Sequence, residues 1–151
     1  MPIKRVGHVV IKMRDLDAAK RFYRDILGMK ITDEREDFGV FFRFDDYHHD
    51  IAVFKVDDDA SAPQRNQVGL AHIALVADSF DTVKAMYQRL KEHDVHIVRT
   101  ADHGITKSVY FQDPEGNELE IYCEVPEVDW HDVETIIVRD PLDLEAPSAK
   151  A

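Results

Sequence analysis

The sequence has little cysteine, with Cys123 as its one thiol among 151 residues. A single thiol cannot form an internal disulfide, and it excludes a zinc site built from several cysteines. Chains with so little cysteine are typical of a reducing compartment, so we expect a cytoplasmic protein. Histidine, by contrast, is plentiful: eight imidazoles are available as metal ligands or proton carriers.

Positive charge and long apolar runs are also scarce. Lysine and arginine together number 19 against 30 aspartate and glutamate residues, which gives a net charge of −11. This excess of acid disfavours binding to a phosphate backbone. No apolar run approaches the roughly 18 residues that span a bilayer, and the N-terminal residues lack the pattern of a signal peptide. We therefore expect neither a nucleic acid nor a membrane as a partner.

The chain contains an internal repeat. Residues 6–27 align without a gap with residues 70–91 at an offset of 64, and this alignment pairs His8 with His72. In each copy a β-branched run leads into apolar residues at helical spacing, and three strand-like segments follow. Each half therefore predicts a β-α-β-β-β module, and the two modules predict an α+β fold with a mixed sheet closed around a shared cleft.

The ends of the predicted elements have recognisable signals. Asp15 and Asp78 are suited to cap the two helices, and Gly28 is suited to end the first one. The segment HHDIAVFKV, residues 48–56, predicts the last strand of the first half. A polar stretch that contains proline then predicts a linker between the halves.

The repeat also predicts the domain organisation. Each half is too short to bury much apolar surface alone, so we expect one domain over residues 1–125, with modules at approximately 3–56 and 67–124. Residues 126–151 predict a partly extended C-terminal extension. Within it, Trp130 and the TIIV segment are expected to dock on the domain or to contribute to a homodimer or higher homo-oligomer.

Three polar residues interrupt apolar strands at related places. His8 and His72 occupy the same position of the repeat, and Glu120 lies between Leu119 and Ile121 near the end of the second half. A histidine in an apolar strand is often a core residue bonded to a carbonyl, but a buried carboxylate needs a cation or several hydrogen bonds. Two imidazoles and one carboxylate form the facial triad that is typical of non-haem Fe(II) oxygenases.

These modules resemble those of the vicinal oxygen chelate superfamily, most closely the type I extradiol ring-cleaving dioxygenases related to catechol 2,3-dioxygenase. The segment DHGITKSVYFQDPEGNELEIY, residues 102–122, is similar to the signature region near the C-terminus of those enzymes. The resemblance implies that His8, His72 and Glu120 bind Fe(II), with Mn(II) or another divalent metal as alternatives.

The resemblance also implies three catalytic residues. Tyr110 lies ten residues before the ligand carboxylate, as in the family, and His103 resembles an active-site histidine of the same signature. The motif HHDIA is similar to the segment that carries a catalytic acid/base histidine, which we assign to His49. An imidazole with an ordinary pKa near 6.5 accepts and returns a proton at neutral pH. His48, on the opposite strand face, is interpreted as structural or solvent-facing.

Members of the superfamily differ in the first-half residue equivalent to Glu120. Glyoxalase I relatives have a second glutamate there. Aligning the two hairpins puts Ile51 opposite Glu120, which favours a three-ligand site; a slip of one residue would bring Asp50 or Ala52 there instead. His49 would then lie two residues before the missing ligand and point at the substrate.

The predicted function is Fe(II)-dependent extradiol cleavage of a small aromatic diol by O2. The alternatives are a glyoxalase-like lyase or isomerase, a thiol transferase of the fosfomycin-resistance type, and a metal-free binding protein of the bleomycin-resistance type. The residues expected to line the pocket are apolar, and they are Val10, Ala74, Phe42 and Ile51.

Overall fold

The computed structural model describes residues 2–136 and 140–145, and these fall into two compact units. The second unit is interrupted by a short turn that belongs to the first. Unit 1 comprises Met1–Val68 and Asp113–Gly116, and unit 2 comprises Gly69–Gln112 and Asn117–Ala151.

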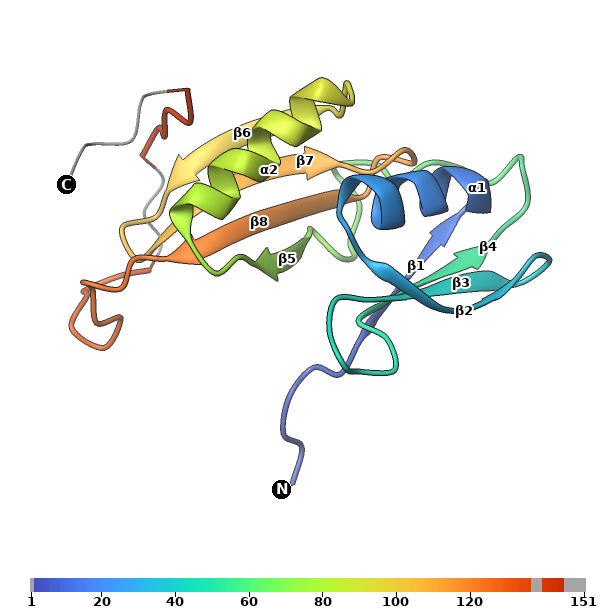
Figure 1. Cartoon of the computed structure of the whole chain (residues 1–151), viewed down its shortest axis with the longest axis horizontal. Coiled ribbons are helices and arrows are strands. Elements are labelled where there is room, and N and C mark those ends of the chain that lie inside the picture. The colour runs from blue at the N-terminus through green and yellow to red at the C-terminus, as the bar shows by residue number, and fades with distance from the viewer. Residues whose placement is uncertain (1, 137–139, 146–151) are drawn as a thin grey trace. The chain divides into compact units, whose positions relative to one another are not determined.

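Unit 1 is a four-stranded mixed sheet with a helical segment on one face (Figure 1). The strand order is β1-β4-β3-β2; β1 and β4 are parallel, and the other pairs are antiparallel. Its elements are β1 (Val9–Met13), α1 (Leu16–Ala19), the π-helix η1 (Lys20–Ile26), β2 (Lys30–Arg35), β3 (Gly39–Arg43) and β4 (Ile51–Lys55).

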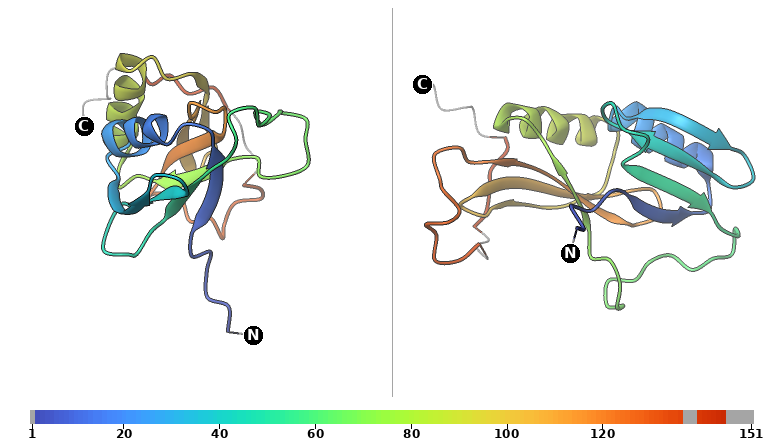
Figure 2. Two further views of the ribbon diagram at one scale, coloured as in Figure 1. Left: turned by 90° about the vertical axis from the view of Figure 1, so that its right-hand side faces the viewer. Right: turned by 90° about the horizontal axis from the view of Figure 1, so that it is seen from below.

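Unit 2 repeats this plan. Its strand order is β5-β8-β7-β6, again with one parallel pair, β5 with β8, and α2 lies over one face of the sheet (Figures 1 and 2). Its elements are β5 (Ile73–Val76), α2 (Phe80–Glu92), β6 (Ile97–Asp102), β7 (Thr106–Gln112) and β8 (Glu118–Glu124). The predicted α+β fold of two βαβββ modules is therefore confirmed, and each module forms its own mixed sheet.

The helices begin largely as their sequences predict. The Asp15 carboxylate caps α1 by accepting from the backbone N–H groups of Asp17 at 2.8 Å and Ala18 at 3.0 Å. The cap of α2 is Ser79, whose hydroxyl accepts from Thr82 N–H at 3.2 Å, so the prediction of Asp78 was wrong. Ser79 is also the residue that the repeat offset pairs with Asp15.

A glycine ends the first helical segment, as predicted. Gly28 has a φ of 80°, which a residue with a side chain rarely adopts, and its N–H donates to the Arg24 carbonyl at 3.1 Å. The segment is α-helical for one turn only and continues as a π-helix over Lys20–Ile26.

Both sheets carry a β-bulge at the same place. In unit 1, Ile31 pairs with Phe42 but Asp33 pairs with Phe41. In unit 2, Ile97 pairs with Phe111 but Arg99 pairs with Tyr110. One extra residue in each edge strand therefore turns the side chains that follow it to the other face of the sheet.

The described part of the C-terminal extension lies against β6 and α2. Asp140 forms an antiparallel bridge with Asp102, and the Thr100 hydroxyl donates to the Leu142 carbonyl at 2.6 Å. Leu144 is buried, whereas Trp130 is 60% exposed, so Trp130 does not dock on the domain, and its role in a homo-oligomer stays a prediction. Part of the TIIV segment, residues 137 and 138, lies outside the described residues. Among the described residues, no helix has the length and apolarity needed to cross a membrane.

Candidate metal and catalytic site

The register of unit 2 places functional side chains in one row across its sheet. Arg99 on β6 pairs with Tyr110 on β7, Tyr110 pairs with Glu120 on β8, and Glu120 pairs with Ala74 on β5. Directly paired residues point to the same face of a sheet, and His72 lies two residues before Ala74. The alternate residues of β8, which are Leu119, Ile121 and Cys123, are buried, and α2 packs against β7 and β8. The row therefore occupies the sheet face that the helix does not cover.

His72 and Glu120 form the centre of this row. The His72 Nε2 atom lies 3.1 Å from Glu120 Oε2. Glu120 is only 7% exposed, so the prediction that it is a buried carboxylate is confirmed. A buried carboxylate beside an imidazole nitrogen supplies one anionic oxygen and one nitrogen ligand, a donor set that suits a divalent transition metal. The chemistry of these two residues therefore fits the predicted metal.

Tyr110 and His103 extend the site beyond the candidate ligands. The Tyr110 hydroxyl lies 2.9 Å from His103 Nε2, and the Tyr110 ring meets the His72 ring edge-on with centroids 5.5 Å apart. Burial, followed by the neighbouring Glu120 carboxylate, raises the pKa of Tyr110, while the Arg99 guanidinium acts in the opposite direction. Tyr110 is thus a protonated hydroxyl at neutral pH, held beside a histidine.

The remaining candidate histidines cluster in unit 1. The ring centroids of His8 and His49 are 4.3 Å apart, and His48 Nδ1 lies 2.6 Å from His49 Nδ1. Burial, followed by the neighbouring His8 and His48, lowers the pKa of His49. Phe41 packs edge-on against the His49 ring with centroids 5.2 Å apart. His49 is therefore a mainly neutral imidazole that can accept a proton at neutral pH.

The structure corrects the predicted position of these histidines in the chain. His48 and His49 precede β4, which begins at Ile51, so they do not belong to the strand predicted over residues 48–56. His8 and His72 likewise precede β1 and β5 and do not lie within them. The side chains are thus held at the points where the chain enters the sheets.

The structure also corrects the residue equivalent to Glu120. In unit 2, Glu120 pairs with both Tyr110 and Ala74, and the corresponding position in unit 1 pairs with both Phe41 and Val10. That position is Ala52, so the prediction of Ile51 was wrong by one residue. The consequence drawn from it still holds, because an alanine side chain cannot bind a metal.

The predicted apolar lining of the pocket divides between two faces. Val10 and Ala74 are exposed. Ala74 shares the sheet face of Glu120, and Val10 shares the face of Ala52, the equivalent residue in unit 1. Phe42 and Ile51 are fully buried and lie on the face of the unit 1 sheet that packs against the helix. The assignment of Phe42 and Ile51 to the pocket was therefore wrong.

The predicted metal ligands divide between the two units. Unit 2 brings His72 and Glu120 together, while His8 lies beside His49 in unit 1. Within the described residues of either unit, no three His, Cys, Asp or Glu side chains form a group that could hold a metal ion. The three-ligand set of His8, His72 and Glu120 stays a prediction.

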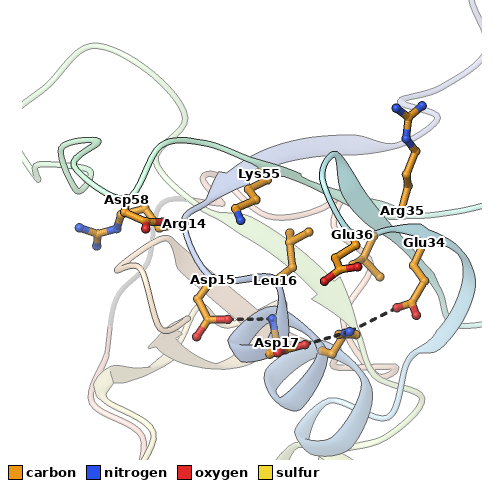
Figure 3. Close-up of a pocket in the computed structure, with 11 residues that line it drawn as sticks. Arg14, Asp15, Leu16, Asp17, Glu34, Arg35, Glu36, Lys55 and Asp58 are labelled. Atoms are coloured by element: carbon orange, nitrogen blue, oxygen red, sulfur yellow. Dashed lines mark hydrogen bonds and ion pairs between the residues drawn. The ribbon is translucent and has the colours of Figure 1, made fainter.

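A cavity of 520 Å³ lies elsewhere in unit 1, beside the start of α1 (Figure 3). Most of its wall is charged, and several of these charges are paired: Lys20 Nζ lies 2.9 Å from Asp17 Oδ1 and 3.5 Å from Glu34 Oε2. None of the predicted catalytic or metal-binding residues lines it. We therefore place the candidate site on the sheet faces.

Sequence reasoning missed Arg99. Simple alternation along β6 puts Arg99 on the same face as Ile97, which faces the helix. The bulge between the two residues turns Arg99 to the face of Tyr110 instead. The guanidinium lies 3.5 Å from the centre of the Tyr110 ring. Neither bulge has a recognisable sequence signal, so the sequence does not reveal that Arg99 and Tyr110 share a face.

The fold of two βαβββ modules extends over the same part of the chain as the match to a known family. Residues 5–121 match the Glyoxalase/Bleomycin resistance protein/Dioxygenase superfamily, and the chain belongs to it. The chain thus carries the fold that its sequence resemblance implied.

Similar proteins perform several reactions. The chain is 30% identical over 122 residues to biphenyl-2,3-diol 1,2-dioxygenase 3 of Rhodococcus globerulus, covering 80% of this chain and 63% of that protein. It is 28% identical over 123 residues to the metallothiol transferase FosB of Staphylococcus haemolyticus, covering 80% of this chain and 84% of that protein. The crystal structure of lactoylglutathione lyase from Agrobacterium tumefaciens matches with a TM-score of 0.63 and 24% identity, covering 82% of this chain and 96% of that one.

Proposed function

We propose that this chain is an Fe(II)-dependent extradiol dioxygenase that cleaves the ring of a small aromatic diol beside its hydroxyl groups. The observation that carries the proposal is the buried Glu120 carboxylate beside His72 Nε2, on the same sheet face as the contact between Tyr110 and His103. The similarity to a biphenyl-diol dioxygenase supports it, although the chain spans about 63% of the length of that relative.

In this proposal His72 and Glu120 would hold the iron, and His8 would be the third ligand. Two neutral imidazoles and one carboxylate leave coordination positions open and a net charge of one on a divalent ion. The bound iron would supply a site where both diol oxygens and O2 meet and exchange electrons. Ala52, in place of a second glutamate, leaves the donor set at three ligands, which argues against a glyoxalase-type site.

The protein side chains would bind the diol and move its protons. His49 has a lowered pKa, so it is neutral at pH 7 and would accept a proton from a diol hydroxyl. Tyr110 and His103 would hold hydrogen bonds to oxygen atoms of the substrate that become more negative during the reaction. Burial keeps Tyr110 protonated, so its hydroxyl is a donor throughout the neutral range.

The test is to load the protein with Fe(II) without oxygen, add a panel of catechols, and follow O2 uptake and the yellow ring-opened product. We expect one O2 consumed per product formed, and no product from Glu120→Gln. A protein that binds Fe(II) and consumes no O2 with any diol would refute the proposal. The expected homodimer or higher homo-oligomer is tested separately by sedimentation velocity.

A second candidate is a metal-dependent thiol transferase. The observation that favours it is the similarity to the metallothiol transferase FosB, of which the chain covers 84%. Its predicted ligands would be the same three residues, so the ligands alone do not separate the two functions. Mn(II)-loaded protein that consumes a thiol in the presence of fosfomycin, and takes up no O2 with catechols, would favour this candidate.

A further inference from the structure

We propose that Arg99 and Glu118 form a clamp that positions Tyr110 for the reaction. This inference rests on the proposed function, because it gives Tyr110 a role at the substrate. Arg99 and Glu118 themselves would not touch the substrate or the metal in this scheme; they would act through the tyrosine ring.

Arg99 covers one face of the Tyr110 ring. Its guanidinium carbon lies 3.5 Å from the ring centre, within the range of an attractive cation–π contact. The two residues are also direct partners across β6 and β7, so their backbones hold the side chains on the same sheet face. The bulge before Arg99 is what brings the side chain to this face.

Glu118 holds the guanidinium in that place. Arg99 Nη1 donates to Glu118 Oε1 at 3.0 Å. The side chains of Arg99 and Glu118 are 38% and 23% exposed, and an ion pair this accessible to water contributes little to stability. The pair therefore has a larger effect on the direction of the guanidinium than on the folding of the sheet.

The Tyr110 ring is constrained on three sides. Arg99 covers its face, the His72 ring meets it at an interplanar angle of 88°, and His103 Nε2 contacts its hydroxyl at 2.9 Å. A tilt of the ring would lengthen at least one of these contacts. The hydroxyl is therefore held in one direction beside the His72 and Glu120 pair.

The first half of the chain serves as an internal comparison. Its equivalent bulge brings Asp33 into register with Phe41, where unit 2 has Arg99 and Tyr110. Phe41 has no hydroxyl to direct, and an aspartate cannot form a cation–π contact with it. The clamp thus occurs in the half that carries the tyrosine hydroxyl.

The clamp is tested first without any substrate. We would prepare Arg99→Met, Glu118→Gln and the double variant, and follow the Tyr110 ring by NMR after labelling the tyrosines with ¹³C. Tyr110→Phe identifies the signal. Arg35→Met is the matched control, because the Arg35 and Asp37 ion pair, at 3.0 Å, is exposed and belongs to unit 1.

We expect the Tyr110 signal to move in Arg99→Met and in Glu118→Gln, to move no further in the double variant than in Arg99→Met, and to stay in place in Arg35→Met. A Tyr110 signal that Glu118→Gln leaves unchanged would overturn the clamp. This readout needs no catechol, so it stands or falls independently of the proposed function.

Turnover gives the second readout. With an active diol, Arg99→Met should lower kcat about tenfold with KM within about twofold of wild type, the size expected when one well-placed contact is lost. Glu118→Gln should lower kcat less, and its effect should vanish in the Arg99→Met background. Additive effects, or an increase in KM alone, would assign Arg99 to substrate binding and contradict the positioning role.

Discussion

Replacement of Tyr23 by phenylalanine tests how the β7–β8 turn is held in unit 1. The Tyr23 hydroxyl donates to Asp113 Oδ2 at 3.0 Å, and both residues are buried. Burial, followed by the Asp113 carboxylate, raises the pKa of Tyr23 well above its ordinary value, so this hydroxyl remains a donor. A hydrogen bond to a buried charged group is worth about 1.5–3 kcal/mol, so we expect Tyr23→Phe to lower the free energy of unfolding by about 2 kcal/mol.

The repeat supplies the control for this experiment. Tyr87 occupies the same repeat position as Tyr23, but it is only partly buried and its ring lies against Lys91. Tyr87→Phe should change stability by less than about 0.5 kcal/mol, as is usual for a substitution near the surface. Urea unfolding followed by circular dichroism measures both variants. Their midpoints report on stability where the dependence of the unfolding free energy on urea concentration is the same as in the wild type. Equal midpoints for the two variants would refute the reasoning, because the argument depends on the buried Asp113 contact alone.

The other predictions concern the candidate site and the acid stability of unit 1. Metal-free Glu120→Gln should be at least as stable as wild type, since a buried charge is costly, yet Fe(II) should no longer raise its melting temperature in calorimetry. His49→Gln should keep its iron, measured by metal analysis, while turnover slows; loss of iron would instead make His49 a ligand. The Arg14 guanidinium lowers the pKa of Glu115, so this carboxylate stabilises the fold above its unfolded pKa near 4.5 and loses that contribution as pH falls through the lower folded pKa. Arg14→Met should make the unfolding free energy fall less steeply toward acid pH, as measured by urea unfolding at a series of pH values.

The repeat predicted much of the fold because its alignment shows directly which residues of the two halves occupy equivalent positions. An offset of 64 residues pairs His8 with His72 and Asp15 with Ser79, and both pairs are structurally equivalent in the two units. Composition alone does not separate Asp78 from Ser79 as the cap of α2, because aspartate and serine are about equally favoured at that position and the two residues are adjacent. The repeat offset was the better guide at this position.

The hairpins could not be predicted to the residue from the sequence. Ile51 and Ala52 both fit an apolar strand, and the choice between them depends on where the β3–β4 connection ends. A slip of one residue moves every side chain to the other face of a sheet. The same slip separates a pocket residue from a core residue, so the predicted pocket side chains of Ile51 and Phe42 lie in the core.

The two units use the same backbone plan for different chemistry. Each has a bulge, a central paired row and a histidine before its first strand. Unit 2 has Arg99, Tyr110 and Glu120 in its row, whereas unit 1 has Asp33, Phe41 and Ala52 at the equivalent positions. A charged carboxylate in both rows would need two compensating cations in the folded protein. In the proposed site the buried carboxylate of unit 2 would need one divalent ion, because the equivalent position in unit 1 is Ala52 and the Asp33 carboxylate of that row is exposed. The asymmetry between the halves is therefore the feature of this chain that supports the proposed three-ligand site over a four-ligand one.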